Sequence, residues 1–198
     1  MNQNPSTTSF VSIFHSINRQ PLLQWDKKIR NGRIKRIRDE DLYSLVLEIF
    51  GPKSATTYIT CPSDPKETLN ITHAVLNMTV KNLNKIFAFD VQILDDKNVK
   101  RRFKASTVQT VPEVKPYSCR LPLTLEEGWN QITIPLQIYT MRCYGTNYVQ
   151  TLRVQVYASC RLRRVFFSNK ICTEEELPLE FRLNHLAIPK RFTEKFGH

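Results

Sequence analysis

The chain has 198 residues, 41% of them hydrophobic and 24% charged, a balance typical of one globular domain. Lys and Arg outnumber Asp and Glu by 29 to 18, which gives a formal net charge of +11 and a pI near 9.6. This composition excludes a disordered or fibrous chain, and no apolar run of about 18 residues predicts a membrane-spanning helix. Because the N-terminus also lacks a basic leader, we expect a cytosolic protein without a secretory signal.

The first eight residues are polar, and we expect residues 1–9 to form a flexible tail before a domain at 10–184. The next strong feature is a run of bases between residues 27 and 38. Asn31-Gly32 predicts a hairpin turn there, followed by "RIKRIR" at 33–38. Bases on both faces of that segment are incompatible with a buried central strand and predict an edge strand or an exposed hairpin arm. "DEDLYSLVLEI" at 39–49 fits either a helix with an Asp N-cap or a strand.

Strict alternation predicts a strand in "FAFDVQIL", with Phe89, Val91 and Ile93 on one face. "DDKN" at 95–98 predicts a turn, after which "VKRRFKA" places its lysines and Arg102 outward. The same alternation points Arg101 inward, so it requires a bulge or a buried partner.

A second alternating strand is predicted in "TLRVQVYA" at 151–158, whereas "RLRRVFF" after it alternates poorly. Shorter β-like runs lie at 56–61, 76–80, 117–121 and 130–134, and Thr173 begins a short helical turn. About ten strands at this spacing predict an all-β chain, a single β-sandwich or jelly-roll-like domain with one or two short helices. Residues 185–198 are expected to form a tail that only a partner would order.

Five irregularly spaced cysteines without a Cys-x-x-Cys pair indicate reduced, mostly buried thiols rather than disulfides or a zinc site. The five glycines form neither a dinucleotide-binding nor a Walker loop, and the four histidines lie far apart. The acidic runs at 126–127 and 174–176 fit solvated turns better than catalytic carboxylates. We therefore predict no enzyme, no metal site and no cofactor.

Positive charge is concentrated: residues 19–38 hold eight bases against Asp26 alone, and 95–104 and 161–170 are also basic. Such segregation predicts basic faces that attract an acidic partner. Trp25, Tyr43 and Trp129 are expected in the core, since no aromatic array recurs within the basic runs.

Long segments of the chain, from about Phe10 to Leu183, resemble the cilia- and flagella-associated protein 20 family. The segments that carry the resemblance are "PLLQWDKKIRNGRIKRI", "SLVLEI", "TTYITCPSDPKETL", "FDVQILDDKNVKRRFKAS", "GWNQI", "YGTNYVQTLRVQVYASCRLRRVFFS" and "EEELPLEFRL". The resemblance implies a jelly-roll β-sandwich without catalytic residues, located in the axonemal doublet microtubule of cilia and flagella and also at the basal body. It implies a place at the inner junction, where the B-tubule closes onto the A-tubule wall. The implied partners are α/β-tubulin of both tubules, the parkin co-regulated protein and other inner-junction microtubule inner proteins.

Tubulin is strongly acidic, so the resemblance gives the basic runs a role as tubulin-binding surfaces. One expected contact surface consists of Lys27, Lys28, Arg30, Arg33, Lys35, Arg36 and Arg38. A second expected surface consists of Lys100, Arg102, Lys104, Arg161, Arg163 and Arg164.

The chain also departs from the family pattern. Arg33 stands where the family usually has histidine, and residues 1–9, "NITHAVLNMTV" and the segment after Leu183 differ as well. These departures indicate a diverged paralogue, and we hypothesise a form that supports sperm motility.

Two other classes of binding protein are compatible with the composition. A basic nucleic-acid-binding module fits the pI but lacks stacking aromatics and recognition motifs, so nucleic acid is not the expected partner. A jelly roll that binds polysaccharide or phosphoinositide would need an exposed aromatic groove, for which the sequence gives no signal. No membrane partner is expected.

Overall fold

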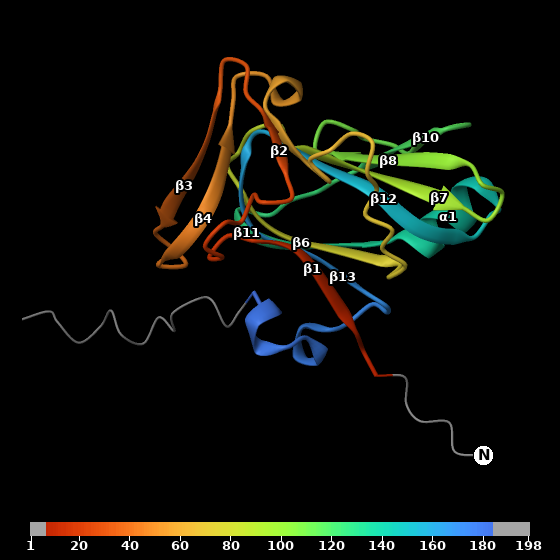
Figure 1. The fold of residues 1–198 in the computed structure, drawn as a ribbon. Coiled ribbons are helices and arrows are strands. Elements are labelled where there is room, and N and C mark those ends of the chain that lie inside the picture. The colour runs from red at the N-terminus through yellow and green to blue at the C-terminus, as the bar shows by residue number, and fades with distance from the viewer. Residues whose placement is uncertain (1–6, 184–198) are drawn as a thin grey trace, which may run out of the picture.

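The computed structural model describes residues 7–183, which form two β-sheets packed face to face (Figure 1). Sheet A has the strand order β11-β6-β13-β4-β3, with β1 paired to β13, and sheet B has the order β2-β5-β12-β7-β8-β10-β9. The strands of sheet A are β1 (Phe10–His15), β3 (Arg33–Asp39), β4 (Ser44–Phe50), β6 (Val75–Asn82), β11 (Gly128–Pro135) and β13 (Cys160–Ser168). The strands of sheet B are β2 (Asp26–Lys28), β5 (Tyr58–Cys61), β7 (Ala88–Asp95), β8 (Lys100–Ser106), β9 (Glu113–Lys115), β10 (Ser118–Pro122) and β12 (Tyr148–Tyr157).

Helical structure in the described range is limited to α1 (Leu136–Tyr144) and three short 3₁₀ turns. The turns are η1 (Ser54–Thr56), η2 (Glu174–Glu176) and η3 (Leu179–Phe181). The predicted all-β sandwich is thus confirmed. The predicted tail at 185–198 and most of the one at 1–9 lie outside the described residues, so those boundaries remain predictions.

The core lies between the sheets and follows the alternation of the sequence. Val91 and Ile93 of β7 and Val154 and Val156 of β12 are completely buried, while Gln92 between the first two is half-buried on the outer face. Each such aliphatic side chain contributes about 1.5–3 kcal/mol through removal from water. The alternation predicted for both strands is therefore confirmed.

The segment 39–49, which fitted helix or strand, contains β4, with Val46, Leu47 and Ile49 buried. A turn precedes the strand, and Tyr43 within it adopts a left-handed φ of 51°. Tyr43 is 59% exposed, so its predicted place in the core is wrong. Trp25, in contrast, is buried and donates a hydrogen bond to the carbonyl of Ile13.

The predicted hairpin at Asn31-Gly32 is also wrong. Asn31 has the expected left-handed φ of 55°, but the strands on either side enter different sheets. β2 pairs with β5 of sheet B, and β3 pairs with β4 of sheet A. The turn therefore connects the two sheets, and Gly32 is required because a Cβ there would lie 2.4 Å from the carbonyl oxygen of Phe50.

Helix α1 was not predicted from the sequence. Pro135 precedes it, and Gly145 ends it with a left-handed φ of 65°, donating its N–H to the Met141 carbonyl. Proline before and glycine after a segment are recognised helix boundaries, so a weak signal was present.

A second, smaller core lies on the outer face of sheet A, where the C-terminal turns cover β1 and β13 (Figure 1). Phe181 stacks on Phe166 with ring centroids 4.6 Å apart and also contacts Phe10 at 5.2 Å. This cover explains why outward-facing side chains of β13 are buried.

The cysteines are free thiols, and Cys61, Cys119 and Cys160 are buried, as predicted for most of them. Burial raises the pKa of Cys61 and of Cys119 to about 12. These thiols therefore remain protonated and poorly reactive at neutral pH.

A buried carboxylate, Asp39, connects four strands of sheet A. Its Oδ2 accepts hydrogen bonds from Arg161 at 2.7 Å and Lys81 at 3.1 Å. Its Oδ1 accepts the indole N–H of Trp129 at 3.1 Å and two backbone N–H groups of the β3–β4 turn. Burial alone would raise the pKa of Asp39, but the bonds from Arg161, Trp129 and Lys81 outweigh it and lower the pKa.

The substitution Asp39→Asn tests this network. The asparagine side chain would keep the Oδ1 acceptor but present an NH₂ group to the two cations, so we expect a loss of about 2–4 kcal/mol in the free energy of unfolding near pH 7. Because the folded state lowers the pKa of Asp39, the difference should shrink as the pH falls below about 4. Urea unfolding across this pH range measures it.

The matched control is Glu40→Gln, which removes an adjacent carboxylate that is 67% exposed but contacts the same Lys81 and Arg161. An exposed ion pair contributes about 0–1 kcal/mol, so the control should change stability little. Equal effects of the two substitutions would contradict the importance of the buried Asp39.

Candidate protein interfaces

The first expected contact surface lies along one edge of the sandwich, with β3 at the left of Figure 1 and β2 nearer the middle. β2 is the outermost strand of sheet B and β3 that of sheet A, and the turn at 29–32 joins them. All seven basic side chains of this segment are exposed, and we call them the basic edge: Lys27, Lys28, Arg30, Arg33, Lys35, Arg36 and Arg38. The prediction of an edge strand at 33–38 is confirmed.

Two residues of the basic edge have structural contacts. Arg33 forms an ion pair with Glu48 at 2.9 Å and stacks on Phe50 at 4.3 Å, and Arg36 donates to the Ser16 carbonyl at 2.9 Å. The other five bases form no ion pair with any part of the chain that the structure describes. Their charges are therefore available to a partner.

The outer face of sheet B carries a second group of bases. The β7–β8–β10 register sets Lys104 opposite Asp90 on one side and Arg120 on the other, and places Arg102 beside Ser118. We call these outward bases the sheet-B face: Lys100, Arg102, Lys104, Lys115 and Arg120. Lys104 is half-buried and the other four are exposed.

Sequence reasoning missed Lys115 and Arg120 of this face. Arg120 stands between the buried residues Cys119 and Leu121, so period-two alternation did point it outward. What the sequence did not reveal is that β10 pairs in parallel with β8, which brings Arg120 beside Lys104. Pairing between strands distant in the sequence sets the extent of the face.

The second expected surface is wrong as a single unit. Lys100, Arg102 and Lys104 lie on sheet B, whereas Arg161, Arg163 and Arg164 lie on β13, inside sheet A. Arg163 and Arg164 are each only 6% exposed, and Arg161 forms ion pairs with Asp39, Glu40 and Glu48. A register shift between Leu162 and Arg164, together with the C-terminal cover, turns these bases into internal groups.

The two buried arginines are satisfied mainly by uncharged groups. Arg163 donates to the hydroxyls of Ser16 and Ser44 and to the Leu45 carbonyl, and burial lowers its pKa. Arg164 stacks 4.3 Å from the Phe181 ring and lies 2.8 Å from Nδ1 of His15. Burial, and then the charges of the two arginines, lower the pKa of His15 to about 4, so this ring is neutral at physiological pH.

The inward-pointing Arg101 has the buried partner that the alternation required. Its Nε donates to Asp95 Oδ2 at 2.9 Å, and its guanidinium stacks 4.2 Å from the Tyr144 ring. Burial opposes ionisation of Asp95, but bonds from the Val99 backbone, Arg101 and Thr146 lower its pKa. This ion pair anchors α1 beside the β7–β8 turn.

Asp90 is a buried acid beneath the sheet-B face. Its Oδ2 accepts a hydrogen bond from the Tyr157 hydroxyl at 2.9 Å, and the Lys104 ammonium lies 4.8 Å from the Tyr157 ring centroid. Burial raises the pKa of Asp90, although the charges of Arg102 and Lys104 and the bond from Tyr157 partly offset this. The ionised carboxylate of Asp90 therefore lowers the stability of the folded state, although it lies beneath a face of positive charges.

Among residues 7–183, no group of three or more His, Cys, Asp or Glu side chains is arranged to hold a metal ion. The helices in that range are all too short or too polar to cross a membrane.

The fold and its exposed charges define an all-β sandwich protein with basic groups on two different sides. The chain belongs to the CFA20 domain family, whose model matches residues 1–185.

Three relatives of the chain share one name. The chain is 54% identical over 183 residues to "Cilia- and flagella-associated protein 20" of Chlamydomonas reinhardtii, covering 92% of this chain and 96% of the relative. Identity to the Paramecium tetraurelia protein of that name is 55% over 191 residues, covering 96% and 100%. The Caenorhabditis elegans protein is 50% identical over 183 residues, covering 92% and 90%. The family resemblance is thus confirmed.

A solved chain described as "Structural analysis of an exo-beta-agarase" aligns with 83% of this chain and 26% of its own length. Its TM-score of 0.38 and 9% identity carry no conclusion.

Because the pKa of Asp90 is raised, we expect that removing its carboxylate will increase the stability of the protein. Asp90→Asn should raise the melting temperature at about pH 8, because asparagine removes the buried charge and still accepts the Tyr157 bond. The folded pKa lies above the unfolded one, so the gain should vanish as the pH falls toward about 4. Thermal unfolding across this range measures it.

Asp96→Asn is the matched control, because hydrogen bonds from Asn147 lower the pKa of this exposed carboxyl. It should give no gain at about pH 8. A gain from both substitutions, or from neither, would overturn the assignment for Asp90.

Proposed function

We propose that this chain is a structural protein of the ciliary or flagellar axoneme, acting as a microtubule inner protein. It bridges A-tubule and B-tubule protofilaments at the inner junction of the doublet microtubule and so supports motility. It performs no catalysis in this role and requires no cofactor.

The observation that carries the proposal is membership of the CFA20 domain family over nearly the whole chain. Relatives from a green alga, a ciliate and a nematode share 50–55% identity and are named cilia- and flagella-associated proteins. Identity of this order over 90% or more of each relative supports a cilium- or flagellum-associated role for this chain.

The arrangement of charge supports the bridging part of the proposal. A bridge contacts two partners at once, and the basic edge and the sheet-B face lie on different sides of the sandwich. Each exposed ion pair contributes only about 0–1 kcal/mol, so several bases on each side are needed for lasting attachment. Tubulin, with its acidic surface, is the proposed partner of both.

The remaining proposed partners are the parkin co-regulated protein and other inner-junction proteins. The proposed location is the cytoskeleton of the cilium or flagellum, with the basal body as a further site. A role confined to sperm predicts a transcript restricted to the male germ line.

Cryo-electron microscopy of doublets isolated from cells that express the chain tests the location. Density at the inner junction that fits Trp129 and Arg33 would support the proposal, since Arg33 separates this chain from a relative with histidine there. Density that fits only such a relative would overturn it.

Charge reversal on the basic edge tests the tubulin contact. Lys35 and Arg38 are exposed and form no ion pair with the described residues, so Lys35→Glu with Arg38→Glu should leave the fold intact. We expect at least about tenfold weaker co-sedimentation with microtubules, because two attractive contacts become repulsive. Circular dichroism checks the fold of the variant.

The control reverses the same number of charges at the other end of the molecule. Lys97 follows β7 and Arg142 lies on α1, and both side chains are exposed. The labels of these two elements lie at the right in Figure 1. If Lys97→Glu with Arg142→Glu weakens binding as much as the edge variant, net charge rather than the basic edge determines attraction.

A further inference from the structure

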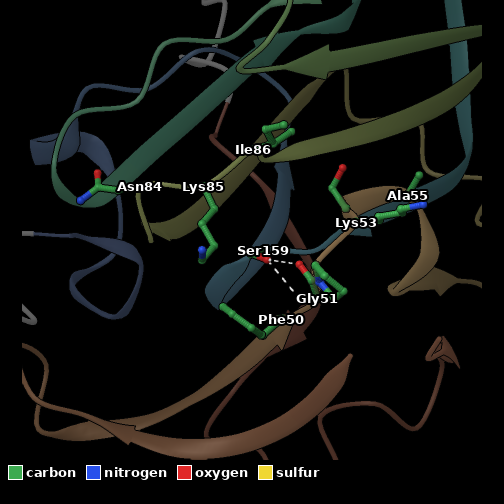
Figure 2. Close-up of a pocket in the computed structure, with 10 residues that line it drawn as sticks. Phe50, Gly51, Lys53, Ala55, Asn84, Lys85, Ile86 and Ser159 are labelled. Atoms are coloured by element: carbon green, nitrogen blue, oxygen red, sulfur yellow. Dashed lines mark hydrogen bonds between the residues drawn. The ribbon is translucent and has the colours of Figure 1, made fainter. Parts of the chain in front are cut away.

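A pocket at one end of the sandwich has features that the proposed function does not use (Figure 2). It has a volume of about 760 Å³ and lies between the segment after β4 and the β6–β7 loop. Its lining residues include Phe50, Lys53, Lys85, Ile86 and Ser159.

The pocket continues into two neighbours. Ser54 and Ile86 also line an adjoining pocket of about 200 Å³, which extends to Lys104 and Arg120 of the sheet-B face. Lys85 and Ile86 also line a third pocket, of about 430 Å³. Because Ile86 lines all three, the pockets adjoin one another, and we call them together the end groove.

The ionisable residues that line the end groove are all bases, although one of them, Arg120, also forms an ion pair with Glu113 at 3.2 Å. The bases are Lys53, Lys85, Lys104 and Arg120, and none of the lining residues is acidic. Arg33 also lies beside Phe50, but its charge is paired with Glu48. A concave surface with charge of one sign concentrates its field, which favours an occupant carrying several negative charges.

The groove also exposes apolar surface between these cations. Ile86 is 54% and Val108 60% exposed, and both side chains line two of the adjoining pockets. The segment after β4, which lines the first of these pockets, is held in place at Gly51. The Ser159 hydroxyl accepts a hydrogen bond from the Gly51 N–H at 3.2 Å and donates one to the Gly51 carbonyl at 3.1 Å (Figure 2). A preformed site of this kind loses little entropy on binding.

We propose that the end groove binds an extended acidic peptide segment, rich in glutamate or aspartate, that places one apolar side chain against Ile86 and Val108. Lys53, Lys85, Lys104 and Arg120 contact the flanking carboxylates. This site is separate from the contact of the basic edge with a folded surface and does not depend on it.

The contacts favour a peptide over a nucleic acid. Binding of single strands uses exposed aromatic rings on which bases stack. The Phe50 ring already has Arg33 at 4.3 Å and Lys85 at 5.6 Å from its centroid, and the other exposed apolar contacts are aliphatic. Aliphatic side chains between cations match an apolar residue between carboxylates.

Fluorescence anisotropy with the full chain tests the proposal. The probe is a fluorescein-labelled, glutamate-rich peptide with a single central leucine, compared with the same peptide carrying glycine in place of leucine. Lys53→Glu with Lys85→Glu should weaken binding of the leucine peptide about tenfold or more, since each contact contributes up to about fivefold. Ile86→Ser should remove the preference for the leucine peptide over the glycine peptide while leaving binding of the glycine peptide unchanged.

The matched control is again Lys97→Glu with Arg142→Glu, which should change affinity for the peptide less than about twofold. Equal weakening by the groove and control variants would overturn the proposal in favour of diffuse attraction. Displacement of the peptide by oligo-dT at lower concentration than by unlabelled peptide would also overturn it and assign the groove to nucleic acid. A groove variant that loses the peptide but keeps microtubule binding would separate this site from the proposed inner-junction role.

Discussion

One buried carboxylate, Asp39, helps to fix the part of the basic edge that lies on β3. The β3–β4 hairpin pairs with the rest of sheet A at only three register positions, Cys160–Leu162 of β13 against Leu47–Ile49 of β4. Asp39, at the end of β3, adds hydrogen bonds to Arg161 and to groups on β6 and β11. These bonds add to the short ladder, to the burial of Leu47 and Ile49 in the core, and to the bonds of Arg163 with Ser44 and Leu45. Together they fix the hairpin that carries Arg33, Lys35, Arg36 and Arg38.

The sequence predicted the fold class and most strands because two-faced strands bury every second residue, and a single side of β7, β8 and β12 faces the core. It also identified the edge strand, from bases on both faces of the segment, and the need of Arg101 for a partner, from local alternation. The prediction failed where the outer face of a strand is covered. On β13 the arginines read as solvated, yet the C-terminal turns and the β3–β4 turn remove them from water. Covering by a segment distant in the sequence leaves no local pattern.

The candidate contact surfaces were likewise predicted where local sequence decides exposure, and missed where distant strand pairing decides it. Every base of the edge was identified, because the outermost strands β2 and β3 leave all their basic side chains exposed. The sheet-B face was identified only in part, because its extent depends on the parallel pairing of β8 with β10. Asn31-Gly32 gave the correct backbone conformation at Asn31 but the wrong connection, since a left-handed residue reverses the chain without determining which strands then pair.

Because several bases are buried, the formal net charge overstates the positive charge that a partner meets. Lys81, Arg161, Arg163 and Arg164 are part of the formal +11, yet they are internal groups that neutralise acids or bond to neutral oxygens. The charges that a partner meets instead form a path along the surface. This path leads from the basic edge past Phe50 into the end groove, and on to Lys104 and Arg120 of the sheet-B face. Screening beyond about 8 Å at physiological ionic strength means that this local path, rather than the total charge, determines which acidic surfaces can bind. A partner that follows the path must itself turn around one end of the sandwich, or else two partners must share it. The second arrangement is the one that the proposed bridge between two protofilaments would require.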